Sequence, residues 1–153
     1  MRTAGEKILQ RENHVIEWLR EIHKSGAPGE ESYMNVKYEG TVTAIGKLAR
    51  KFLETNNSVI LLDEGAHPNL AEMVVEHTPG ELKGDIAVGD TFSLGKQKYK
   101  VTRIGENVND TIRESGHCTL LFNAKGSMPG QIELEGGAVP PLSQGQKFAF
   151  AGK

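Results

Sequence analysis

The chain has 153 residues, 25% of them charged, and a net charge of −2, which suits one globular domain with a modest hydrophobic core. No stretch approaches the ~18 consecutive apolar residues that span a membrane, and no secretory segment opens the chain, so we expect a cytoplasmic protein. A single cysteine, Cys118, excludes an internal disulfide. Scattered basic residues and the absence of a zinc-ligand histidine pair argue against nucleic acid and metal.

The first predicted element is an N-terminal helix over residues 3–25, because apolar residues recur there with helical spacing. These residues are Ile8, Val15, Leu19 and Ile22. Gly26 and Pro28 then provide a stop signal. We therefore expect residues 1–32 to form a helical extension with a linker, and residues 33–153 to form a β domain. The helix could pack on that domain or bind a partner.

Beyond the linker, short apolar or alternating blocks between turn signals predict strands. The predicted strands cover residues 36–45, 58–62, 70–77, 91–94, 97–104, 118–122, 131–134 and 147–150. A short helix is expected between residues 107 and 115, ended by Gly116 in the left-handed conformation. The predicted fold class is mainly β, a small antiparallel barrel or sandwich with an added N-terminal helix and one short internal helix.

His77 is the main candidate for chemistry, because it precedes the glycine-bracketed turn Gly80-Glu81-Leu82-Lys83-Gly84. A neutral imidazole is nucleophilic near neutral pH and can carry a phosphoryl group. Backbone N–H groups of Gly80 and Gly84 could approach phosphate oxygens, and the Lys83 ammonium could offset their charge. We expect His77 to be exposed, because burial would keep a protein donor away. The alternative is a histidine that merely ends a strand before an ordinary turn.

A second set of short motifs follows in a characteristic order. They are Gly80-Glu81-Leu82-Lys83-Gly84, Phe92-Ser93-Leu94-Gly95, Tyr99, Val101-Thr102, Ile104-Gly105, Arg113-Glu114, Gly116-His117, Thr119-Leu120, Phe122 and Pro129-Gly130. In order and spacing this set resembles the glucitol/sorbitol-specific EIIA component of the bacterial phosphoenolpyruvate-dependent phosphotransferase system. The resemblance covers residues 36–150 and is strongest over 77–122. It implies a compact barrel-like β domain.

The resemblance also implies a function, phosphoryl transfer between proteins with a phosphohistidine intermediate. The family's phosphorylated histidine lies three residues before the Gly-Glu-Leu-Lys-Gly block, which is the position of His77. Family members often have a second histidine where this chain has Pro79. Phospho-HPr would donate to His77, and His77 to a cysteine of EIIB or EIIBC, without a cofactor and touching the membrane only through the EIIC transporter. The alternative is a phosphorylation-dependent regulatory or adaptor protein on the same fold.

Three further residues are candidates for the site. His117 belongs to the family-like block and could orient His77 or contact its phosphoryl group, or it could be a core histidine bonded to a backbone carbonyl. Glu72 and Glu76 belong to a segment, residues 61–85, with six carboxylates and a single basic residue, Lys83. Such a surface suits a basic partner such as HPr, although the carboxylates could also form an ordinary solvated face.

Overall fold

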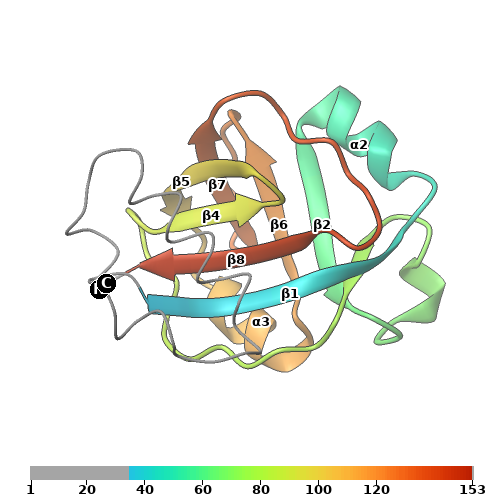
Figure 1. Cartoon of the computed structure of the whole chain (residues 1–153), viewed down its shortest axis with the longest axis horizontal. Helices are drawn as coiled ribbons and strands as arrows, with labels where there is room; N and C mark the ends of the chain where they lie inside the picture. The colour runs from blue at the N-terminus through green and yellow to red at the C-terminus, as the bar shows by residue number, and fades with distance from the viewer. Residues whose placement is uncertain (1–34, 153) are drawn as a thin grey trace, which may run out of the picture.

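The alternating apolar residues of the chain close into a barrel. The computed structural model describes residues 35–152, which form eight strands, two α-helices and one short 3-10 helix (Figure 1). The elements are β1 (Asn35–Ile45), α2 (Ala49–Asn56), β2 (Ser58–Asp63), η4 (Pro68–Leu70), β3 (Val75–His77), β4 (Thr91–Leu94), β5 (Gln97–Ile104), α3 (Val108–Ser115), β6 (Cys118–Phe122), β7 (Gln131–Gly136) and β8 (Lys147–Gly152). The predicted N-terminal helix, and with it the boundary of the extension, lies outside the described residues.

The strands follow the order β1-β3-β2-β6-β7-β5-β4-β8 around the closed barrel. Two neighbouring pairs, β2 with β3 and β6 with β7, are parallel, and the remaining neighbours are antiparallel. The barrel prediction is confirmed, but the all-antiparallel arrangement is wrong. The reason is physical: apolar alternation reports which face a residue occupies and carries no information on strand direction.

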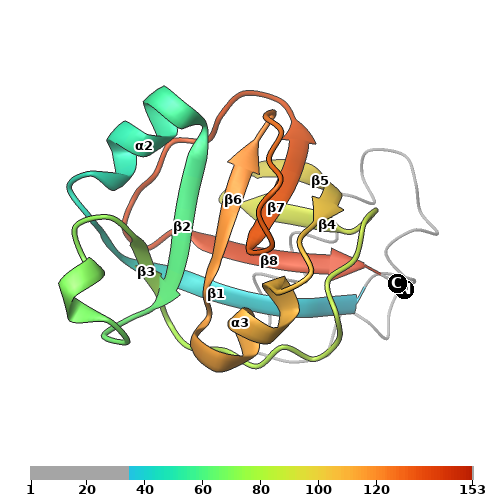
Figure 2. The ribbon, with the colours of Figure 1, turned by 180° about the vertical axis from the view of Figure 1, so that it is seen from behind.

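Aromatic side chains fill the interior of the barrel. Phe92, Phe122, Phe148 and Phe150 are fully buried. The rings of Phe92 and Phe150 have their centroids 4.7 Å apart. Each large apolar side chain removed from water contributes about 1.5–3 kcal/mol, so this cluster is a main source of the barrel's stability. Figure 2 shows α3 lying across the end of β6 where that strand begins.

Most predicted strands are confirmed within two residues of their ends, and two local predictions fail. Only the last part of the predicted strand 70–77 pairs, as β3, because the preceding residues form η4 and a turn that leaves Leu70 and Met73 partly exposed. The sequence does not predict helix α2, because Ala49 and Leu53 are its only buried residues and two residues are too few to establish a helical period. The short internal helix and its left-handed end at Gly116 are confirmed, with φ of 63°.

Within the described residues, no helix is long and apolar enough to cross a membrane.

Two glycines on adjoining backbone segments provide a test of barrel closure. A Cβ on Gly105 would overlap the carbonyl oxygen of Pro129, whereas a Cβ on Gly130 would meet nothing within 4 Å. Gly105→Ala should therefore destabilise the protein by about 1–3 kcal/mol, because backbone must move. Gly130→Ala should change the free energy of unfolding by less than ~0.5 kcal/mol. Urea unfolding measures both, and equal losses in the two variants would contradict the close approach at Gly105.

Candidate functional site

His77 ends β3 with its side chain directed into the barrel. Burial alternates along this strand, with Val75 and His77 buried and Glu76 between them only partly buried. The His77 side chain has 0% of its surface exposed. The Phe148 ring meets the imidazole edge-on with centroids 5.0 Å apart, and Tyr38 does so at 6.1 Å. The strand period therefore places the imidazole in an aromatic end of the barrel core.

Each ring nitrogen of His77 lies within hydrogen-bond distance of a backbone carbonyl oxygen. Nδ1 lies 2.8 Å from the carbonyl oxygen of Thr78, and Nε2 lies 2.9 Å from that of Gly116. A carbonyl oxygen only accepts hydrogen bonds, and a neutral imidazole has one N–H, so satisfying both carbonyls requires the doubly protonated ring. In either protonation form a carbonyl oxygen lies against each ring nitrogen, at 2.8 and 2.9 Å, so a phosphorus atom cannot reach the ring in this closed arrangement.

A carboxylate stands beside the same ring. Asp63, the last residue of β2, has its Oδ1 atom 3.8 Å from Nδ1 of His77. A Cβ added to Gly116 would overlap that Oδ1 and would lie 2.7 Å from Cε1 of His77. The backbone of Gly116 thus lies against both the Asp63 carboxylate and the His77 ring. Only glycine, which has no side chain, can approach these two groups so closely.

The predicted exposure of His77 is wrong. The glycine-rich turn after His77 suggested a surface site, but the turn begins one residue later, and His77 still follows the inward alternation of β3. Its ring also satisfies two carbonyl groups that would otherwise lack a partner. Val75 and His77 are two residues apart and therefore lie on the same face of β3, which would indicate burial of both. The strand has only three residues, however, and is too short to establish this alternation from the sequence.

The segment from Thr78 to Lys83 runs alongside β1 and borders a cleft of about 420 Å³. The Thr78 N–H donates to the carbonyl of Thr41, and the Lys83 N–H to that of Lys37. Glu81 and Lys83 are exposed, and across the described part of the chain no hydrogen bond or ion pair joins either of them to the His77 ring. The structure therefore places the segment next to His77 without bringing its charged side chains onto the ring.

His117 does not contact His77 either. Its Nδ1 atom lies 3.3 Å from the carbonyl oxygen of Leu61, and the side chain is half-buried. The neighbouring Gly116 contacts His77 instead, through its backbone carbonyl. Cys118 is fully buried, and that burial raises the pKa of its thiol to about 12, so it remains a neutral thiol.

The two candidate docking carboxylates lie on the outside of the barrel. Glu72 is exposed and lies 3.5 Å from the Lys47 ammonium, in an ion pair open to solvent. The Oε2 atom of Glu76 accepts a hydrogen bond from the Gly65 N–H at 3.3 Å. Glu76 is next to His77 in β3 but faces the other side of the sheet.

Comparison with known proteins identifies the family. The family model "PTS system glucitol/sorbitol-specific IIA component" matches residues 37–149. The chain belongs to this family. It is 36% identical over 119 residues to the glucitol/sorbitol-specific EIIA components of Shigella flexneri and Escherichia coli (strain K12), covering 76% of this chain and 96% of each relative. This protein is therefore a phosphocarrier component of a phosphotransferase system, and its partners belong to such a system.

A solved structure supports the fold. The crystal structure of a PTS system IIA component from Enterococcus faecalis V583 superposes with a TM-score of 0.63 at 24% sequence identity. The match covers 72% of this chain and 96% of that chain. At this level of identity the likeness shows a shared fold.

The close approach of Gly116 can be separated from its backbone conformation. Gly116 and Gly95 have nearly the same φ, 63° and 60°, but a Cβ on Gly95 would make only an ordinary contact of 3.5 Å with Gln146. Gly95→Ala and Gly116→Ala should both incur the left-handed penalty of about 1–2 kcal/mol. Only Gly116→Ala should lose stability beyond that penalty and shift the His77 ring signals in the NMR spectrum. Identical behaviour of the two variants would mean that Gly116 serves the turn alone.

Proposed function

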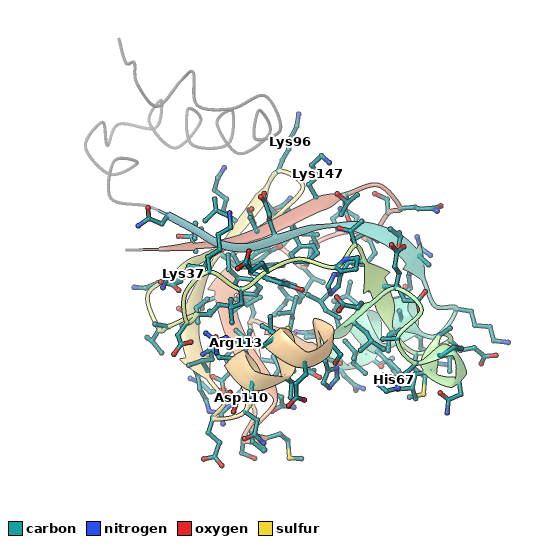
Figure 3. All side chains as sticks on the ribbon, turned by 90° about the horizontal axis from the view of Figure 1, so that it is seen from below. Lys37, His67, Lys96, Asp110, Arg113 and Lys147 are labelled. Carbon is teal, nitrogen blue, oxygen red and sulfur yellow. The ribbon has the colours of Figure 1, made fainter. Side chains whose placement is uncertain are left out.

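We propose that His77 is the phosphorylated residue, accepting the phosphoryl group from phospho-HPr and passing it to a cysteine of the glucitol/sorbitol EIIB or EIIBC protein. The observation that carries this proposal is the position of His77 three residues before Gly80, where the family's Gly80–Gly84 block begins, with a carboxylate beside its ring. The other described histidines lack this setting. His67 is exposed on the β2–β3 connection (Figure 3), and His117 is bonded to a strand carbonyl.

The surroundings of the ring favour Nε2 as the nitrogen that carries phosphate. Nδ1 has two oxygen neighbours, the Thr78 carbonyl and the Asp63 carboxylate. Nε2 has one, the carbonyl of Gly116. A proton is therefore held better on Nδ1, and deprotonation of the ring leaves the lone pair on Nε2.

Transfer then requires a local opening. The Gly116 carbonyl leaves Nε2, one proton leaves the ring, and the Nε2 lone pair attacks phosphorus as the N–P bond of the donor histidine breaks. In the second step a cysteine thiolate of the acceptor attacks the same phosphorus, and the His77–phosphorus bond breaks. Positioning of two facing side chains and electrostatic stabilisation of a loose transition state supply the catalysis.

Several finer parts of the function stay predictions. The names of the relatives support a sugar alcohol, glucitol (sorbitol), as the transported substrate of the system. Lys83 and the glycines Gly80 and Gly84 are predicted to support the phosphoryl group after opening, and a cytoplasmic location is expected from the role. His117 is predicted to contribute to the opened site, which Gly116 adjoins.

Exchange of each histidine for glutamine tests the assignment. Alanine in place of this buried ring would leave a cavity, so glutamine, which retains polar groups and much of the volume, is the better variant. After incubation with phosphoenolpyruvate, Enzyme I and HPr, His77→Gln should carry no acid-labile phosphate by mass spectrometry. His117→Gln should still be phosphorylated, and phosphate should then move to EIIB. Phosphate on a folded His77→Gln variant, verified by circular dichroism, would overturn the assignment. Phosphate that never leaves wild type would favour the regulatory alternative.

Charge reversal tests docking. Glu72→Lys should slow phosphorylation by HPr, most strongly at low ionic strength, because exposed charges steer encounter and salt screens them. The matched control is Glu135→Lys, an exposed carboxylate on β7, a strand separated from β3 by β2 and β6. Both variants should unfold within about 1 kcal/mol of wild type. Rates that fall equally in the two variants, or equally at every ionic strength, would eliminate steering by Glu72.

A further inference from the structure

The carboxylate of Asp63, the last residue of β2, contains a buried oxygen atom without a hydrogen-bond partner. Oδ1 of Asp63 is inaccessible to solvent and makes no hydrogen bond, although the side chain as a whole is 23% exposed. Buried carboxylate oxygens are normally hydrogen-bonded or paired with a cation, and an exception in a native structure needs an explanation.

The parallel pairing of β2 and β3 aims this carboxylate at His77. Val59 and Leu61 are buried along β2, and the same parity places Asp63 on the inner face. Asp63 and His77 are register partners, as Leu61 and Val75 are one inward position earlier. The inward row that holds apolar pairs in the barrel therefore ends in an acid beside an imidazole.

The side chains of Lys37 and Arg113 form ion pairs with carboxylates other than that of Asp63. The Lys37 ammonium lies 2.8 Å from Asp90 Oδ2, and Arg113 pairs with Asp85. The groups that face the Asp63 carboxylate are the His77 imidazole and, less closely, the Tyr38 hydroxyl, which is also buried without a hydrogen-bond partner. Burial first, and the Asp63 charge second, raise the pKa of Tyr38, so this phenol stays neutral. Among the described residues, His77 is the one basic group that lies within 4 Å of an Asp63 carboxylate oxygen.

We propose that Asp63 is a positioning residue for phosphoryl transfer at His77: once the Gly116 carbonyl has left Nε2 and freed the ring to shift, Oδ1 shares with the Thr78 carbonyl the task of holding the proton of Nδ1. The inference rests on the proposed role of His77. Attack through Nε2 forms the nitrogen–phosphorus bond and makes the ring positive while Nδ1 keeps its proton. The Asp63 carboxylate offsets that charge and keeps the ring in the tautomer whose lone pair is on Nε2.

Asp63→Asn removes the charge and preserves the shape. The control is Asp110→Asn, which makes the same chemical change at an exposed position in the first turn of α3 (Figure 3). The maximal rate of phosphoryl transfer from phospho-HPr to Asp63→Asn should fall by about tenfold or more, because a charge near the reacting ring is lost. The apparent KM for phospho-HPr should not change, since Oδ1 is buried and cannot touch a partner. Asp110→Asn should match wild type in both quantities.

Nitrogen-15 NMR of the His77 ring provides a readout that a merely structural role would not move. In phosphorylated wild type, Nδ1 should carry a proton and Nε2 should couple to phosphorus. In Asp63→Asn the neutral ring should lose its preference for the Nδ1–H tautomer. The inference would be overturned if Asp63→Asn showed the wild-type rate of phosphoryl transfer and the wild-type preference for the Nδ1–H tautomer.

The same measurement keeps the two proposals distinguishable. It also covers the case in which Asp63→Asn does not fold, because phosphate on Nδ1 of the wild-type protein would by itself eliminate a proton-holding role for Asp63. Wild-type protein that takes phosphate on a residue other than His77 would instead overturn the proposed function.

Discussion

The structure depends on one constraint, a buried imidazole whose two nitrogens both face carbonyl oxygens. The Thr78 and Gly116 carbonyls join the end of β3 to the beginning of β6 through the His77 ring. The ring thereby replaces backbone pairing at the barrel end, where β2 separates these two strands. A ring nitrogen that is bonded to a carbonyl group in this way is not a free nucleophile, so the proposed phosphoryl transfer at His77 would compete with the structural contact at Nε2.

Strand direction decides what stands beside the ring. In a parallel pair the ends of two strands coincide, so the last residue of β2 lies beside the last residue of β3. An antiparallel pair would have placed the beginning of β2, a serine followed by apolar residues, next to His77. The parallel pair in an otherwise largely antiparallel barrel is therefore what brings a carboxylate to the imidazole.

Much of the fold could be predicted from the sequence, because the strands appear as short apolar or alternating blocks and glycines lie between them. Gly116 was placed in the left-handed conformation from its position after a short helical pattern, and its φ of 63° agrees. Burial of His77 and the partnership with Asp63 could not be predicted, since both depend on strand direction and register, which involve residues distant along the chain. Asp63 appeared in the sequence as one acid among several. The apolar run from Val59 to Leu62 does not alternate, so the sequence gives no parity from which the inward direction of Asp63 could be read.

If His77 carries the phosphate as proposed, the phosphorylated protein must differ locally from the structure described. A single methyl group on Gly116 would already overlap Asp63 and crowd the His77 ring, and the Gly116 carbonyl stands 2.9 Å from Nε2. A phosphoryl group is larger than a methyl group and carries negative charge, which neither a carbonyl oxygen nor a carboxylate would tolerate at that distance. Under the proposed assignment, phosphate on Nε2 would displace the turn between α3 and β6, and the conformation of that turn would differ between the phosphorylated and unphosphorylated forms. A donor and an acceptor that dock against this turn would each meet a different surface, which gives the two steps of the relay a structural basis for direction.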